Sequence, residues 1–273
     1  MTLARKRLVQ MDQTLPLSGR HALVCGASAG IGQASAFALA KMGATLTILA
    51  RRQQRLEDLV APLKEAGAPD VYTLVADFDK RDDLVTKVSN HLEQHGSIQI
   101  WINNTGGPPG GLLLEAEEEE LLTAFGRHLF SAQRLLKLLL PGMKDAGYGR
   151  IISVLSTSVR EPIPQLGVSN TVRAAMASWS KTLSGELPPG ITINSILPGF
   201  TATERLASLA EARAEKANTT PEDIERGWLL SIPEGRLGSA DELGNVIAFL
   251  ASPMASYVRG VCLPVDGGRL RSI

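Results

Sequence analysis

Short apolar runs alternate with amphipathic stretches along nearly the whole chain. Helical spacing predicts helices over 30–42, 52–66, 81–95 and roughly 115–146, a helix carrying Ser169 and Arg173, helical pieces in 201–229, and a last helix that begins with the capping box Ser239–Glu242. The runs with the pattern of buried strands are 21–25, 44–50, 71–76, 98–102, 150–155, 191–197 and 261–265. This alternation predicts an α/β fold whose parallel sheet is covered by helices on both faces.

Length and composition favour a single domain that handles a small molecule. The chain has 273 residues, 44% of them apolar, which is enough for one large core over 17–273 behind a loose N-terminal arm at 1–16. Lys and Arg number 28, as do Asp and Glu, so no overall field attracts nucleic acid or an anionic membrane. We therefore expect a small-molecule substrate, no nucleic-acid partner, no membrane partner and no metal.

Two further features bear on location. The start of the chain lacks the apolar core of a signal peptide, and no apolar run approaches the length that spans a membrane. The two cysteines, Cys25 and Cys262, fall in strand-like runs and are predicted to be buried, reduced thiols. These observations predict a cytoplasmic protein.

A glycine-rich turn follows the first predicted strand and begins the first predicted helix. The segment CGASAGIG (25–32) places glycines at 26, 30 and 32. Small residues let the backbone approach a pyrophosphate, and the helix N-terminus supplies N–H groups and the positive end of the helix dipole. The segment predicts nucleotide binding, although a tight strand-to-helix turn alone has the same appearance. A second small-residue cluster, NNTG (103–106), ends the fourth predicted strand.

These motifs, taken in order, resemble those of the classical short-chain dehydrogenase/reductases, near the β-ketoacyl-carrier-protein reductases. The turn at 25–32 is similar to the family's Thr-Gly-x₃-Gly-x-Gly, NNTG to its Asn-Asn-Ala-Gly, LPGFTAT (197–203) to its Pro-Gly loop, and the block 232–268 to its C-terminal segment. The resemblance implies a three-layer, Rossmann-type, doubly wound parallel sheet of seven strands. It also implies a nicotinamide cofactor and a homo-oligomer, a tetramer or a dimer.

The end of the second strand predicts which dinucleotide binds. An acidic side chain there hydrogen-bonds the free ribose 2′-hydroxyl of NAD(H), whereas a basic side chain pairs with the 2′-phosphate of NADP(H). Here Arg51 and Arg52 follow the strand, so we expect NADP(H), with NAD(H) as the alternative cofactor; the competing interpretation is that both arginines merely begin a solvated helix. Including positions that the resemblance implies, such as Asp77 against the adenine, the predicted cofactor residues are Gly26, Ser28, Gly30, Ile31, Gly32, Arg51, Arg52, Asp77, Phe78, Asn103, Asn104, Gly106, Arg173, Pro198, Gly199, Thr201 and Thr203.

The catalytic positions implied by the resemblance depart from the family's Asn, Ser, Tyr and Lys. Ser156 stands where the family has Ser, which orients the carbonyl. Ser169 stands at the position of Tyr, the proton donor, and Arg173 at that of Lys, which lowers the pKa of the tyrosine and holds the nicotinamide ribose. His128 stands where the family's Asn holds a proton-relay water. Tyr148 and Tyr257 lie elsewhere in the sequence and are not expected to replace the missing tyrosine.

The substitutions replace the expected proton donor by a much weaker acid, but they keep a side chain that can bind the cofactor ribose. A serine hydroxyl ends roughly 4 Å short of a tyrosine oxygen by bond-length counting, and its pKa is that of an alcohol. Arg173 can hold ribose hydroxyls but does not shuttle protons. Loss of a positioned general acid typically costs ~10²–10⁴-fold in rate.

Three functions remain open after these substitutions. The first is an NADP(H)-dependent oxidoreductase, similar to 3-oxoacyl-carrier-protein reductases, whose proton comes from His128 or water. The second is a cofactor-binding pseudoenzyme that acts as a regulator or subunit, and the third is non-redox chemistry such as that of a lyase or dehydratase. If His128 is the donor, turnover is expected to follow a group that titrates near neutrality; otherwise the histidine is structural. The substrate pocket is expected to be lined by 105–114 and 200–230.

Overall fold

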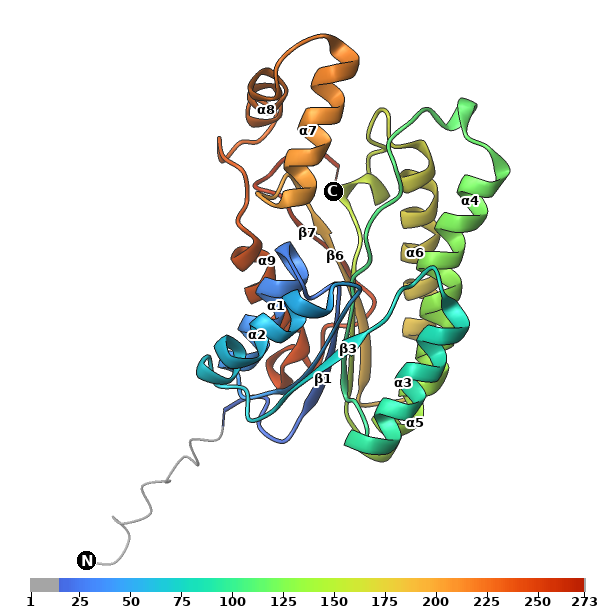
Figure 1. The fold of residues 1–273 in the computed structure, drawn as a ribbon, viewed down its shortest axis with the longest axis vertical. Coiled ribbons are helices and arrows are strands. Elements are labelled where there is room, and N and C mark those ends of the chain that lie inside the picture. Colours follow the sequence, from blue (N-terminus) through green and yellow to red (C-terminus); the bar gives the residue numbers. More distant parts are fainter. Residues whose placement is uncertain (1–14, 273) are drawn as a thin grey trace, which may run out of the picture.

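The computed structural model describes residues 15–272, which form a parallel sheet between two layers of helices (Figure 1). The sheet has seven strands in the order β3-β2-β1-β4-β5-β6-β7, and all neighbouring pairs are parallel. The predicted three-layer, doubly wound α/β fold is confirmed. The strands are β1 (His21–Cys25), β2 (Thr45–Ala50), β3 (Val71–Val75), β4 (Ile100–Asn103), β5 (Gly149–Val154), β6 (Ile191–Pro198) and β7 (Cys262–Val265). The predicted arm at 1–16 lies outside the described residues, except for its last two.

Helices cover both faces of the sheet because its strands are apolar on both sides. One core cluster joins the sheet to α1 (Gly30–Lys41), α2 (Gln53–Glu65) and α9 (Ala240–Ala251). The other joins it to α3 (Arg81–His95), α5 (Ser131–Asp145) and α6 (Gly167–Glu186). Two further helices, α7 (Glu204–Ala217) and α8 (Pro221–Leu229), lie beyond the carboxyl ends of the strands in Figure 1.

The order of the strands reverses direction between β1 and β4. Strands β2 and β3 extend the sheet on one side of β1, after which the chain returns to place β4 on the other side. In open parallel sheets, ligands bind in the crevice outside the carboxyl ends of the strands at such a reversal. The glycine-rich turn after β1 and the NNTG segment at the end of β4 both lie at this edge.

The long helix predicted over roughly 115–146 is interrupted. It consists of α4 (Glu118–Phe125), one π-helical turn (Gly126–Phe130) and α5, preceded by a short 3₁₀ turn at Leu113–Glu115. A contact outside the helix accompanies the wide turn: the hydroxyl of Ser131 donates to the carbonyl oxygens of Gly126 at 3.0 Å and of Phe78 at 3.2 Å. A π-turn holds one extra residue in the helix, so it changes the direction in which Arg127 and His128 point.

The two cysteines differ in environment. Cys25 is fully buried in the central strand β1, and burial raises the pKa of its thiol to about 12. Cys262 is only partly buried, because β7 is an edge strand with a neighbour on one side. Both are free thiols, but the prediction that both are buried is wrong for Cys262. Within residues 15–272, no helix is both long and apolar enough to cross a membrane.

Candidate functional site

A cavity of about 630 Å³ lies at the carboxyl edge of the sheet. Its walls come from the turns and loops that follow β1 to β6 and from α7, so it joins segments that are far apart in the sequence. Of the four predicted catalytic residues, Ser156, Ser169 and Arg173 line the cavity and His128 does not. The predicted cofactor residues that line it are Gly26, Ser28, Gly30, Ile31, Arg51, Arg52, Asp77, Phe78, Asn104, Gly106, Arg173, Pro198, Gly199, Thr201 and Thr203.

The glycine-rich turn has the geometry of an anion cradle. Gly26 and Gly30 have φ of +62° and +54°, which L side chains rarely adopt. Ala29, the N-cap of α1, offers no side-chain hydrogen bond to the first turn, so those backbone N–H groups are available to a ligand. Gly32 does not line the cavity; a Cβ there would lie 2.2 Å from the carbonyl oxygen of Gly26, so this glycine allows close packing of the turn on the helix.

The two asparagines that end β4 have different roles. The side-chain amide of Asn104 donates to the carbonyl oxygen of Cys25 at 3.3 Å, which ties the end of β4 to the end of β1 at the cavity. Asn103 is buried and lies 3.5 Å from the hydroxyl of Ser153 on the neighbouring strand. Asn103 does not line the cavity, and its predicted contact with the cofactor stays a prediction.

Cations gather where the second strand ends. The guanidinium of Arg52 donates to the hydroxyl of Ser28 in the glycine-rich turn at 3.3 Å, and Arg51 lines the same end of the cavity. Glu204 is the nearest acid and lies 4.0 Å from Arg52. The open helix N-terminus, the close-packed glycine turn at 26–32 and the two arginines together fit the pyrophosphate and 2′-phosphate of NADP(H).

Arg173 lies in the wall of the cavity with its guanidinium almost completely buried. It donates to the carbonyl oxygens of Val154 at 2.7 Å and Thr105 at 3.4 Å, and so connects the end of β5 to the loop after β4. Burial and the nearby charge of Arg205 lower the pKa of Arg173 to about 10. The group is therefore a cation at neutral pH, and no carboxylate among residues 15–272 forms an ion pair with it.

Ser156 and Ser169 both line the cavity and are partly exposed. The oxygen of Ser156 accepts from the backbone N–H of Ser158 at 3.1 Å, which fixes the side chain and leaves its proton free to donate. Ser169 makes no side-chain hydrogen bond to any described residue. Tyr148 is buried and donates to the carbonyl oxygen of Ala251 at 2.6 Å, and Tyr257 is fully exposed. Neither tyrosine lines the cavity, as expected.

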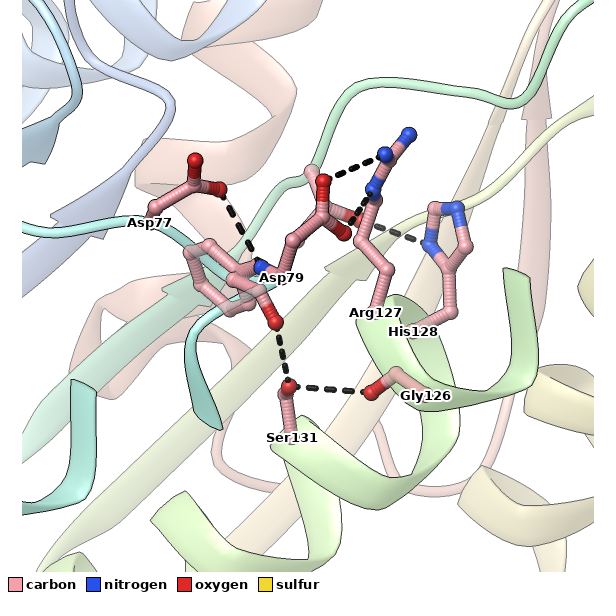
Figure 2. Close-up of polar contacts among 8 residues, drawn as sticks. Asp77, Asp79, Gly126, Arg127, His128 and Ser131 are labelled. Carbon is pink, nitrogen blue, oxygen red and sulfur yellow. Dashed lines mark hydrogen bonds and ion pairs between the residues drawn. The ribbon is translucent and has the colours of Figure 1, made fainter. Parts of the chain in front are cut away.

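The π-helical turn holds two of its side chains against the ends of β3 and β4 (Figure 2). Arg127 forms a two-pronged ion pair with Asp79, with N–O distances of 2.7 and 2.6 Å. This pair lowers the pKa of the Asp79 carboxyl and raises that of Arg127. Nδ1 of His128 lies 2.6 Å from the hydroxyl of Thr105, which does line the cavity.

The expectation that His128 titrates near neutrality is wrong. Its side chain is 3% exposed, and burial together with the charges of Arg173 and Arg127 lowers its pKa to about 2. The imidazole is therefore neutral at pH 7, and it reaches the cavity only through the hydroxyl of Thr105. Its Nε2 is buried with no partner among the described residues.

Sequence reasoning missed the basic side chains that α7 and the C-terminal segment bring to the cavity. Within the expected segment 200–230, the lining residues end at Arg213, and Trp228 of α8 instead stacks on Phe200. Arg205 and Arg213 are eight residues apart, a spacing that places them on one face of a helix and would have been a usable signal. Arg269 has no such signal, because it follows the last strand in an irregular segment. Arg127 and Arg269 lie outside every segment predicted to line the cavity, whereas Thr105, Gly107, Pro108, Phe200, Arg205, Ser208 and Arg213 line the cavity within the expected segments 105–114 and 200–230 but were not singled out.

Comparison with known sequences places this geometry in one family. A family model described as enoyl-(acyl carrier protein) reductase matches residues 26–269. A 3-oxoacyl-(acyl-carrier-protein) reductase of Pseudomonas aeruginosa is 35% identical over 94% of this chain and 100% of its own length. An NADPH-dependent reductase of Bacillus subtilis, BacG, is 31% identical over 94% of this chain and 100% of its own length.

Solved structures agree with the sequence comparison. The L-sorbose reductase of Gluconobacter frateurii, crystallised with NADPH and L-sorbose, superimposes with a TM-score of 0.88, is 30% identical, and is matched over 95% of this chain and 100% of that chain. Actinorhodin polyketide ketoreductase, crystallised with NADPH, gives a TM-score of 0.86 at 28% identity over 93% and 98% of the two chains. The chain therefore belongs to the short-chain dehydrogenase/reductase family.

Proposed function

We propose that the protein is an NADP(H)-dependent oxidoreductase that interconverts a carbonyl and an alcohol on a small molecule. NADP(H) is the cofactor that its relatives indicate, since BacG is named as NADPH-dependent and the sorbose reductase was crystallised with NADPH. The single observation that carries the proposal is the contact of Arg52 with Ser28, which brings a cation to the glycine-rich turn. When bound, the nicotinamide supplies or accepts the hydride.

The residues of the chain supply binding and orientation in this proposal. The fixed hydroxyl of Ser156 donates a hydrogen bond to the substrate oxygen, and the buried cation of Arg173 favours negative charge that develops there. No His, Tyr, Cys or Lys of residues 15–272 lines the cavity, and its two carboxylates belong to Asp77, which follows β3, and to Glu204, which lies beside Arg52. The proton therefore comes from water, relayed through the hydroxyls of Ser169 and Thr105, while His128 is a positioning residue that acts through Thr105.

The same measurements test a second function, binding of NADP(H) without turnover, which stays open because no tyrosine among the described residues lines the cavity. A protein that binds NADP(H) through the same cradle without turnover, as a regulator or subunit, needs the arginines and glycines but not the proton donor. The two functions differ in one measurable quantity, the rate of NADPH oxidation in the presence of carbonyl compounds.

Calorimetry and turnover test the proposal together. We expect NADPH to bind at least tenfold more tightly than NADH, and Arg52→Gln to remove this preference. Arg55→Gln is the matched control, since Arg55 is also exposed and pairs with Glu204 but does not line the main cavity. NADPH oxidation with a panel of ketones supports an oxidoreductase; tight NADPH binding with no oxidation supports the cofactor-binding alternative. NADH bound as tightly as NADPH contradicts the proposed cofactor.

We further propose that the protein acts in the cytoplasm as a homo-oligomer, a dimer or a tetramer. The exposed apolar side chains of Leu122 on α4 and Phe130 at the end of the π-helical turn support an assembly, since both lie on the same helical layer outside the core. Light scattering coupled to size-exclusion chromatography measures the mass directly. A monomer at micromolar concentration contradicts this part of the proposal.

A further inference from the structure

The wall of the cavity is strongly basic although the chain as a whole is neutral. Seven arginines line it, against only two acids, Asp77 and Glu204. Cations gathered in a concave, partly dry site raise the local concentration of anions. The cofactor accounts for part of this charge, because Arg51 and Arg52 lie at the end that fits its 2′-phosphate, and Arg127 is paired with Asp79. Four arginines remain: Arg173, Arg205, Arg213 and Arg269.

Three of the remaining arginines hold the walls of the cavity together. Arg173 bonds to the backbone carbonyl groups described above. Arg205, near the start of α7, donates to the carbonyl oxygen of Pro108 at 2.9 Å. Arg213, two turns further along α7, donates to the carbonyl oxygen of Pro164 at 3.0 Å. Helix α7, which lies over the carboxyl ends of the strands in Figure 1, is therefore fastened by cations to the loops that precede α4 and α6.

Arg213 and Arg269 share an aromatic floor. The rings of Phe200 and Trp228 stack with centroids 4.9 Å apart. The guanidinium carbon of Arg269 lies 4.7 Å from the centre of Phe200, and that of Arg213 lies 5.9 Å from the centre of Trp228. Arg269 also donates to the hydroxyl of Thr157 at 3.0 Å, directly beside Ser156 in the chain. The stack thus holds two cations in the wall of the cavity, and one of them, Arg269, contacts the chain neighbour of Ser156.

These two cations lack a counter-charge in the part of the chain that the structure describes. No carboxylate of residues 15–272 forms an ion pair with either, and both Nε atoms are buried without a hydrogen-bond acceptor. Glu161 is near enough to feel the charge of Arg269, but its carboxylate accepts from the backbone N–H groups of Arg271 and Ser272. Burial and the charge of Arg269 lower the pKa of Arg213. Like charges held together in this way favour an anion between them.

We propose that the substrate carries an anionic group, a carboxylate or a phosphate, that binds to Arg213 and Arg269 while its carbonyl group lies at Ser156. This inference rests on the proposed function, because it assumes that the cofactor occupies the other end of the cavity. Each guanidinium uses one terminal nitrogen on the protein, Arg213 on Pro164 and Arg269 on Thr157, and keeps the other for the ligand. An uncharged ketone of the same size lacks the group that these cations recognise.

Matched pairs of ligands test the inference without requiring turnover. Isothermal titration of the protein saturated with NADP⁺, which cannot reduce a ketone, with levulinate, methyl levulinate and dihydroxyacetone phosphate compares a carboxylate, its neutral ester and a phosphate. We expect at least one of the two anions to bind at least tenfold more tightly than the ester, a factor of about 1.4 kcal/mol. The comparison between the two anions identifies the preferred group. An ester that binds as tightly as both anions overturns the inference, even if no variant can be purified.

Variants then locate the site. Arg213→Gln and Arg269→Gln should each weaken binding of the preferred anion at least tenfold and leave the ester and NADPH unchanged. Arg226→Gln is the matched control, because Arg226 lies on α8, is exposed and does not line the cavity. Arg213→Lys keeps the charge and should keep most of the preference, which separates loss of charge from loss of folding.

The outcomes for the inference and for the proposed function are distinct. NADPH that binds normally, with no preference for either anion over the ester, overturns this inference alone. A preference that depends on both arginines, in a protein that does not bind NADPH, overturns the proposed function and leaves the anion site in place. A tenfold loss of NADPH affinity in Arg213→Gln assigns the arginine to the cofactor and overturns the inference.

Discussion

A buried cluster of histidines far from the cavity makes the fold sensitive to acid. The hydroxyl of Thr47 on β2 lies 2.7 Å from Nε2 of His21 on β1 and 2.6 Å from Nε2 of His91 on α3. A hydroxyl between two ring nitrogens donates to one and accepts from the other, so one ring must carry its proton on Nε2 and the other on Nδ1. This arrangement requires the ring that accepts the hydroxyl proton to be neutral. Protonation of the ring that accepts the hydroxyl proton breaks it.

The structure gives the size of the effect. Burial, together with the charge of His95, lowers the pKa of both His21 and His91 from 6.5 to about 4. Because the folded pKa is below the unfolded pKa, the unfolded chain binds more protons between pH 6.5 and 4, and stability is lost as the pH falls through this window. For one ring the loss is about 2 kcal/mol at pH 5 and approaches about 3 kcal/mol below pH 4, with no change above pH 7.

Urea unfolding at pH 7.5 and pH 5.0, at one protein concentration, measures the effect. We expect His91→Gln to lose about 2 kcal/mol less stability than the parent between these two values, since glutamine cannot titrate. His95→Gln is the matched control, because His95 is on the same helix but exposed. It should lose nearly as much stability as the parent, since burial is the larger cause of the lowered pKa of His91. Equal losses in the parent and His91→Gln would refute the reasoning.

Three further predictions concern the site. Gly32→Ala should weaken NADPH binding more than tenfold, since its Cβ would meet the oxygen of Gly26; calorimetry measures this, and Gly227→Ala, which adds a methyl group to open space, should have no effect. Ser169→Tyr with Arg173→Lys should raise NADPH-dependent ketone reduction more than either single change, because the tyrosine needs the lysine to lower its pKa; a double variant that binds NADPH and stays inactive contradicts this. His128→Asn should leave the pH profile of turnover between pH 6 and 8 unchanged, because the buried imidazole is neutral throughout; an altered profile would restore the histidine as an acid.

The sheet was predictable because its strands are continuous apolar runs separated by helices. Their periodicity and their spacing depend on local sequence, and so does the turn at 25–32. The π-helical turn was not predictable, since GRHLF contains no proline and its one glycine is tolerated inside α-helices. The contacts that accompany it, from Arg127 to Asp79 and from Ser131 to Phe78, join segments about fifty residues apart. Tertiary contacts of this kind leave no periodic signal.

The sequence predicted which residues form most of the candidate site, but not the burial and the charges around them. The sequence places a histidine at position 128, but only the fold reveals that its ring is buried beside two arginines and neutral. Asn103 illustrates the same limit, because a shift of one residue along a strand turns a side chain to the opposite face. Arg269 lines the cavity because the chain turns back toward it after β7, and no short sequence motif predicts this path.

The departures from the family pattern form one connected group of contacts. By the motif correspondence predicted from the sequence, Thr105 stands where the family has Ala and His128 where it has Asn; the threonine hydroxyl lies 2.6 Å from the imidazole. The carbonyl oxygen of the same threonine accepts from Arg173, which stands where the family has Lys. Substituted side chains that satisfy one another's polar groups are a feature of a site rebuilt around new contacts. Restoring a single position leaves its neighbours mismatched: lysine cannot bridge Val154 and Thr105 as the guanidinium fork does. This coupling supports our proposal of a retained function with altered chemistry, and it predicts that the gain from Ser169→Tyr with Arg173→Lys increases further when Thr105→Ala and His128→Asn are added.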